Sequence, residues 1–172
     1  MKTLIKKWLA KRWLKKYGIK NYTINANGEI DVNGSVDLSS RNLTRFPPFI
    51  QFGTVSGYFD CSYIGLTSLK GAPKKVKGCF DCSYNQLTSL EGAPKEVKGY
   101  FNCSGNQLTS LEGSPKNIGE DFYCSFNHLT SLEGAPKVVR GMFVCSYNRT
   151  NFSIFSEEDV RKVCKVRDEI LV

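Results

Sequence analysis

The side chains that could carry out acid–base or nucleophilic chemistry in this chain are few. Asp60 and Asp81 hold the same place in successive copies of a repeated sequence. On adjacent coils of a repeat fold they would lie about 5 Å apart, near the carboxylate separation of a retaining glycoside hydrolase. No further acid or proton-transfer partner accompanies them, and the single histidine, His128, takes the place that Gln86 holds in another copy of the repeat. We therefore predict that the chain is not an enzyme.

The cysteines are the other chemically reactive group, and most of them are periodic. Five of the seven follow one another at a constant interval, which we call the repeat period: Cys61, Cys82, Cys103, Cys124 and Cys145. Basic residues between positions 6 and 12 interrupt the apolar core that a secretory signal would need, which favours a reducing, cytoplasmic location. Cys79 and Cys82 form a lone CxxC without the second pair that a tetrahedral zinc site requires. We predict reduced, buried thiols with a structural role, and neither a metal nor a cofactor.

The composition is that of an ordinary globular domain with one unusual end. The 172 residues are 41% hydrophobic and 23% charged, and no uncharged apolar run is long enough to span a membrane. The net charge of +8 comes from residues 1–20, because the rest of the chain holds equal numbers of basic and acidic side chains. The segment 1–20 holds eight basic residues and no acid. The charge therefore belongs to one segment and not to the whole surface.

The repeat period extends well beyond the cysteines. Apolar residues recur in several columns: Val55, Val76, Val97, Ile118 and Val139; Phe59, Phe80, Phe101, Phe122 and Phe143; Leu66, Leu87, Leu108 and Leu129; Leu69, Leu90, Leu111 and Leu132. Polar and turn residues form two more: Asn85, Asn106, Asn127 and Asn148; Pro73, Pro94, Pro115 and Pro136. Phe and Cys, separated by a single residue, point inward from a short strand, and the inward Asn can satisfy backbone groups of neighbouring coils. A single coil cannot bury its apolar side, so the pattern predicts a stacked solenoid.

This unit resembles the leucine-rich repeat, L-x-x-L-x-L-x-x-N/C-x-L. Phe80 and Cys82 take the places of the two strand leucines, Asn85 that of the asparagine and Leu87 that of the last leucine. The short period with a late proline, as in LTSLEGAP at 87–94, is similar to the bacterial type III effector class. The lead-in at 21–40 followed by such coils is similar to leucine-rich-repeat proteins of tailed phages. The resemblance implies an α/β solenoid: a right-handed coil with a parallel concave sheet, short extended convex segments and helical caps at both ends.

We divide the chain into a basic N-terminal capping helix (1–20), the repeat domain (21–155) and a C-terminal capping helix (156–172). The first coil departs from the period, because the step from Leu38 to Cys61 is longer by two positions than the step from Cys61 to Cys82, and we place this excess in PPFIQFGT. Ile24 and Ile30 are expected to belong to a hairpin that leads into this coil. Thr150 stands where the last repeat should have a leucine, and so does Ser153. An apolar stripe predicts that the C-terminal helix continues to about residue 170.

The N-terminal segment has several interpretations. Its apolar side chains follow an i, i+4 spacing with lysines on the opposite face, as in an amphipathic helix. The simplest interpretation is a cap in which Trp8 and Trp13 close the first coil. The alternatives are a helix that lies on an anionic membrane surface, a contact with nucleic-acid phosphate, or a contact with a protein.

The outward positions of the strands and turns predict a binding face. Aromatic residues with few lysines are typical of the core of a protein interface. We expect a partner to bind these residues on the concave side: Tyr58, Asp60, Tyr63, Asp81, Tyr84, Tyr100, Asn102, Tyr123, Phe126 and Tyr147.

Nucleic acid is not the expected partner, because the lysines between coils lack the interleaved aromatics that base stacking needs. They form a solvated margin, which Glu91, Glu112 and Glu133 could offset. The predicted function is a non-enzymatic protein-binding module, and the resemblance implies a phage-encoded protein that binds a protein of the bacterial host. A virion or assembly component, and a protein that acts on membranes or nucleic acid through residues 1–20, are the alternatives.

Overall fold

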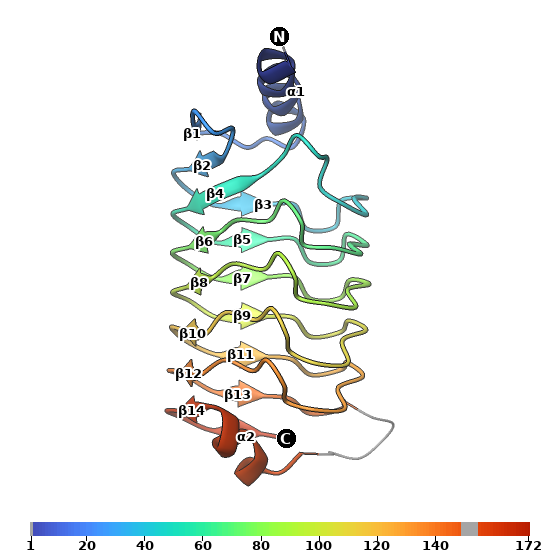
Figure 1. Cartoon of the computed structure of the whole chain (residues 1–172), viewed down its shortest axis with the longest axis vertical. Helices are drawn as coiled ribbons and strands as arrows, with labels where there is room; N and C mark the ends of the chain where they lie inside the picture. The colour runs from blue at the N-terminus through green and yellow to red at the C-terminus, as the bar shows by residue number, and fades with distance from the viewer. Residues whose placement is uncertain (1, 149–154) are drawn as a thin grey trace.

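The chain forms a β-solenoid in which each regular coil contributes one short strand to each of two parallel sheets (Figure 1). The computed structural model describes residues 2–148 and 155–172. We call the first sheet the valine sheet: β1 (Tyr22–Ile24), β2 (Ile30–Val32), β4 (Phe52–Val55), β6 (Lys75–Val76), β8 (Glu96–Val97), β10 (Asn117–Ile118), β12 (Val138–Val139) and β14 (Lys165–Val166). We call the second the phenylalanine sheet: β3 (Val36–Asp37), β5 (Phe59–Asp60), β7 (Phe80–Asp81), β9 (Phe101–Asn102), β11 (Phe122–Tyr123), β13 (Phe143–Val144) and β15 (Ile170–Leu171).

The register of the phenylalanine sheet follows the sequence period. Phe80 pairs with Phe59 on one side and with Phe101 on the other, each exactly one repeat period away. The three side chains are fully buried, and their rings stack with centroids 5.7 and 5.3 Å apart. The interior is therefore a continuous column of apolar side chains that no single coil could bury alone.

The asparagine column connects neighbouring coils, as the sequence predicts. The Asn106 amide nitrogen donates to the carbonyls of Cys82, in the preceding coil, and Cys103, in its own, at 3.1 and 3.0 Å. Its carbonyl oxygen accepts the backbone N–H of Leu87 at 3.0 Å. Asn106 is 6% exposed, so one side chain satisfies buried backbone groups on two coils.

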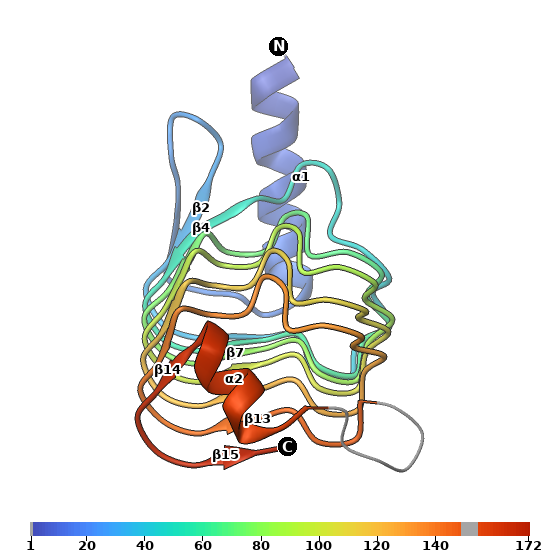
Figure 2. The same ribbon diagram turned by 60° about the horizontal axis from the view of Figure 1, so that its bottom comes forward.

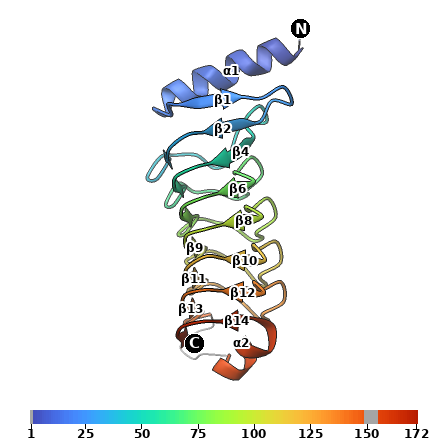
Figure 3. The ribbon, with the colours of Figure 1, turned by 90° about the vertical axis from the view of Figure 1, so that its left-hand side faces the viewer.

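The cross-section of a coil differs from the predicted one. The segments opposite the phenylalanine sheet also pair with one another as strands. We expected one parallel concave sheet with unpaired extended segments on the other side, whereas Val55, Val76 and Val97 lie on strands of a second parallel sheet. At the corner between the sheets, a Cβ atom on Gly78 would lie 2.8 Å from the carbonyl oxygen of Gly57, so glycine lets successive corners stack closely. The described chain is mainly β and not α/β, and its coils stack in a nearly straight column (Figure 3).

Helix α1 (Lys2–Lys16) and an antiparallel hairpin of β1 and β2 lie at the N-terminal end, where the sequence predicts a helix and a hairpin. The prediction that both tryptophans close the first coil is wrong for one of them. Trp13 is buried and its ring contacts Phe46 and Phe52, whereas Trp8 is 54% exposed. The longer spacing of the first coil is also confirmed, because Val36 pairs with Phe59.

The C-terminal end contains a shorter helix than predicted. Helix α2 (Glu157–Val163) begins at a capping box of Ser156 and Asp159 and ends at Cys164, whose backbone is extended. The chain then adds another rung to each sheet, because Val166 pairs with Val139 and Ile170 pairs with Phe143 (Figure 2). The predicted helix to residue 170 is therefore wrong. The expectations for Thr150 and Ser153 lie outside the described residues.

Candidate partner-binding face

The predicted binding residues lie along the outer side of the phenylalanine sheet and in the turn after each of its strands. We call this set the aromatic face: Tyr58, Asp60, Tyr63, Asp81, Tyr84, Tyr100, Asn102, Tyr123, Phe126 and Tyr147. Asp60, Asp81, Asn102 and Tyr123 are in register on adjacent strands β5, β7, β9 and β11. A pocket of about 240 Å³ also brings Tyr58 and Tyr100 beside Asp60 and Asp81. The sheet is not curved inward at this face, so the expected concave shape is absent from the described coils (Figure 3).

The acidic residues of the face have a structural task that the sequence analysis missed. The Asp60 carboxylate accepts the backbone N–H and the hydroxyl of Ser62 at 2.8 and 2.7 Å. Asp81 holds Ser83 in the same way, at 2.8 and 2.6 Å. Each carboxylate therefore stabilises the turn that follows its own strand. The D-x-S spacing in the sequence was the signal for this role.

The acceptor is absent at the same position of β11, which has Tyr123, and of β13, which has Val144. Tyr123 stands where the preceding coils have Asp81 and Asn102, and a tyrosine ring cannot accept from the backbone two residues later. The hydroxyl of Ser125 is buried, and in the described part of the chain it has no hydrogen-bond partner. The turn after β11 therefore lacks a stabilising interaction that the turns after β5, β7 and β9 have.

The Tyr123 ring instead turns toward its own neighbours on the face. Its hydroxyl donates to Asp121 at 2.7 Å, and its ring lies edge-on to Tyr100 with centroids 6.1 Å apart. Partial burial, followed by the hydrogen bond to Asp121, raises the pKa of Tyr123 to about 12. Burial likewise raises the pKa of Tyr100. Both phenols are therefore uncharged donors at neutral pH.

The most exposed part of the face is a row of aromatic side chains in the turns. We call it the aromatic ladder: Tyr63, Tyr84, Phe126 and Tyr147, which are 59%, 46%, 52% and 64% exposed. All four have left-handed backbone conformations, with φ between 51° and 57°. The intervening coil has Gly105 at this position with a φ of 67°. Left-handed backbone favours glycine or asparagine, and a bulky residue there is an outlier.

The ladder consists of two stacked pairs. The rings of Tyr63 and Tyr84 are 4.4 Å apart and nearly parallel, and those of Phe126 and Tyr147 are 4.8 Å apart and nearly parallel. Gly105 has no side chain to continue the stack, and the Tyr84 ring leans over it. In each pair the two ring faces that meet are covered, and the rest of each ring remains exposed.

The periodic cysteines take no part in this face. Cys61, Cys82 and Cys103 are fully buried, and each thiol donates to a carbonyl of the following coil at 3.2 to 3.3 Å. Burial raises the pKa of each of these thiols. They are packing residues of the interior, as predicted, and their reactivity is low.

The lysines between coils form the charged margin that the sequence predicts, with different acidic partners. Lys74 pairs with Glu29, and Glu96 pairs with Lys98 at 2.8 Å and with Lys75 at 3.5 Å. These are exposed pairs that contribute little to stability. The margin runs along the valine sheet, away from the aromatic ladder.

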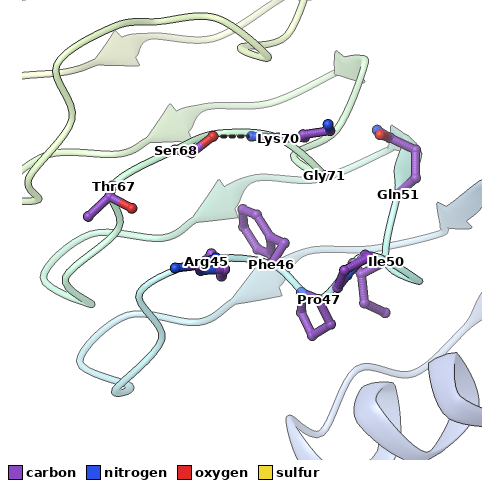
Figure 4. Close-up of a pocket in the computed structure, with 10 residues that line it drawn as sticks. Arg45, Phe46, Pro47, Ile50, Gln51, Thr67, Ser68, Lys70 and Gly71 are labelled. Carbon is purple, nitrogen blue, oxygen red and sulfur yellow. Dashed lines mark hydrogen bonds between the residues drawn. The ribbon is translucent and has the colours of Figure 1, made fainter.

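A further pocket, not anticipated from the sequence, lies at the irregular first coil (Figure 4). It has a volume of about 590 Å³, and its lining includes Phe46, Pro47 and Ile50 together with Arg45 and Lys70. Gly71 has a φ of 104°, and a Cβ atom there would lie 2.8 Å from the Cβ atom of Phe46. The pocket therefore lies where the chain accommodates the two extra residues of this coil. It holds no group of three or more metal-ligating side chains, nor does any other place among the described residues.

No comparison identifies the chain. Protein-family models, curated proteins and solved structures were searched, and none of them matches it. Within the described ranges 2–148 and 155–172, no helix has the length and apolar character needed to cross a bilayer.

Proposed function

We propose that this chain is a non-enzymatic protein-binding module and that its aromatic face binds the partner. The observation that carries the proposal is the aromatic ladder: four large aromatic side chains are exposed on left-handed backbone. Each such residue costs roughly 1 kcal/mol or more relative to a residue that suits this conformation. Exposed rings recover little of this cost by burial. Aromatic residues in these positions are therefore better explained by a contact with another molecule than by folding.

A second observation supports the same face. Tyr123 occupies a position where an aspartate or asparagine would satisfy the following turn, and the buried Ser125 hydroxyl lacks a partner among the described residues. At this position the turn loses a stabilising hydrogen bond, and the face gains the aromatic side chain of Tyr123. Loss of stability at a surface site is typical of residues kept for binding.

The chemistry of the face suits a protein partner. Tyrosine provides a large contact area and loses little side-chain entropy, and the residues that dominate interface energies are enriched in it. The stacked pairs hold their rings in place before binding, which lowers the ordering cost further. Hydrogen bonds from the turn serines hold the carboxylates of Asp60 and Asp81 in fixed positions on this face.

The finer identity is also a proposal. The asparagine column and the late proline of each unit support descent from short leucine-rich repeats, of which the second parallel sheet would be a variation. A phage-encoded protein that binds a host protein in the bacterial cytoplasm is the form we favour, with a virion or assembly component as the alternative.

The test is capture from a bacterial lysate by the immobilised protein, followed by mass spectrometry. The comparison is between the natural chain, a ladder variant (Tyr63→Asn and Tyr84→Asn) and a margin variant (Lys95→Glu and Lys116→Glu). We expect a protein that the natural chain and the margin variant retain and the ladder variant loses. If the ladder variant still captures this protein and the margin variant does not, the partner binds the lysine margin, and the proposal for the aromatic face is wrong.

A further inference from the structure

Helix α1 has two apolar surfaces, and only one of them is used by the fold. Ala10, Trp13 and Leu14 are buried against the first coil. Leu4, Ile5 and Trp8 are exposed by 73%, 53% and 54%. Because residues in a helix advance by about 100°, Trp8 and Ala10 point to nearly opposite sides. The helix is therefore not the one-faced amphipathic helix that the sequence spacing suggests: one surface closes the solenoid and another faces solvent.

The exposed surface is strongly basic. The sequence of α1 contains seven lysines or arginines and no acid. None of the ion pairs found within residues 2–148 and 155–172 involves a side chain of α1. The Arg12 guanidinium instead lies over the Trp8 ring, 4.7 Å from its centroid. Glu29 lines the same pocket as Lys6 and Lys7, and none of the ion pairs of the described residues neutralises the other basic side chains of the helix.

The charge also works against the helix itself. The first turn lacks the acidic residue that would favour the positive end of the helix dipole. An external anionic surface would supply the missing negative charge and would cover the exposed apolar side chains at the same time.

We propose that α1 docks this protein on an anionic lipid surface. Leu4, Ile5 and Trp8 enter the interface between headgroups and acyl chains, and neighbouring lysines contact the lipid phosphates and carboxylates. The combination of an exposed tryptophan, two aliphatic residues and surrounding lysines is the composition of an interfacial helix. Nucleic-acid phosphate would satisfy the lysines but leave the leucine and isoleucine without a role.

The position of the helix permits this contact. It lies at the N-terminal end of the stack, and its first turns rise away from β1 (Figure 3). A bilayer at that end would touch neither the phenylalanine sheet nor the turns that follow it. Lipid docking and partner binding therefore use separate surfaces, and this inference stands independently of the proposed function.

The test is sedimentation of the full chain with vesicles of phosphatidylcholine, with and without phosphatidylserine. We expect binding to the anionic vesicles, weakened by salt, and a loss of about tenfold or more in the variant Leu4→Ser, Ile5→Ser and Trp8→Ser. The matched control is Lys116→Glu and Lys137→Glu, which changes exposed lysines elsewhere and should bind like the natural chain. A melting temperature for each variant, equal to that of the natural chain, separates lost binding from lost folding.

Three results would overturn the inference. The natural chain could fail to bind anionic vesicles, or bind neutral vesicles equally well. The triple serine variant could bind like the natural chain. A natural chain that ignores vesicles but binds double-stranded DNA, with binding lost on Lys11→Glu and Lys15→Glu, would make nucleic acid the target of this helix.

Discussion

The rings of Tyr63 and Tyr84 lie face to face, with centroids 4.4 Å apart and planes inclined by 13°, although both residues have left-handed backbone. Two effects oppose each other at this pair. Ring stacking stabilises it by about 0.5–1.5 kcal/mol, and the backbone conformation of each residue costs roughly 1 kcal/mol or more. The pair therefore contributes little net stability, which is the basis of the first prediction.

We predict that Tyr63→Asn changes the free energy of unfolding by less than about 1 kcal/mol in either direction, because asparagine accepts left-handed backbone readily and this conformational gain offsets the lost stacking. Urea unfolding of the two proteins measures this difference. A loss of about 3 kcal/mol, the size expected for a core aromatic, would mean that the ring is part of the folded core and would weaken the assignment of the ladder to binding.

The turn that contains Ser125 predicts a substitution that raises stability. Tyr123→Asn provides the acceptor that Asn102 supplies in the preceding coil, where the Ser104 N–H donates to its oxygen at 3.0 Å. We expect the free energy of unfolding to rise by about 0.5–1.5 kcal/mol, measured by urea titration. Tyr100→Asn, which restores no turn, is the control and should not be stabilising. If both substitutions destabilise equally, Tyr123 is a packing residue.

The asparagine column should tolerate substitution poorly. Asn106→Ala leaves the buried N–H of Leu87 without its acceptor, whereas the Cys82 carbonyl keeps its hydrogen bond from the Asn85 amide. A buried group left unsatisfied costs about 1–3 kcal/mol, so we expect a loss of about 1–3 kcal/mol. Gln107→Ala, at the exposed neighbouring position, should change stability by less than about 0.5 kcal/mol. A similar small effect at Asn106 would show that backbone pairing alone holds the coils together.

Tyr123 also predicts a dependence of stability on pH. Its pKa in the folded chain is about 12, above the ordinary value near 10, so the unfolded chain releases its proton first. Its contribution is therefore complete below about pH 10 and is lost as pH rises toward 12. Stability measured at pH 8 and pH 11 should fall more steeply in the natural chain than in Tyr123→Phe. The buried thiols and Tyr100, whose pKa values burial also raises, are present in both proteins, so an equal fall would assign the effect to those groups.

Much of the fold could be predicted because the repeat states the same burial pattern several times. Phe80 and Phe101 are recognisably equivalent from sequence alone, and the structure pairs them. The second sheet was missed because its strands from β6 onward are two residues long, and a single buried valine gives no alternation that identifies a strand. The C-terminal strands were missed because Val166 and Ile170 fit a helix as well as a coil. Their separation of four residues, the same as that of Val139 and Phe143, was the usable signal.

The candidate site was predictable in position but not in detail. Alternation along a strand places Asp60 and Asp81 on the outer side, and the structure confirms that they lie side by side. Their bonds to the turn serines depend on backbone geometry after the strand, which residue type alone does not specify. The left-handed conformation of Tyr84 is still harder to predict, because tyrosine normally avoids it. Trp8 and Trp13 lie on different sides of the same helix, and the sequence does not specify which side packs on the first coil.

The most direct measurement of the central claim is the affinity of the captured partner for the natural chain and for a variant with all four ladder residues changed to asparagine. Calorimetric titration, with melting temperatures measured in parallel, provides both quantities. We predict a weakening of about 100-fold or more with a melting temperature close to that of the natural chain, because interface energy is concentrated in a few aromatic side chains. An unchanged affinity in a folded variant would contradict the account.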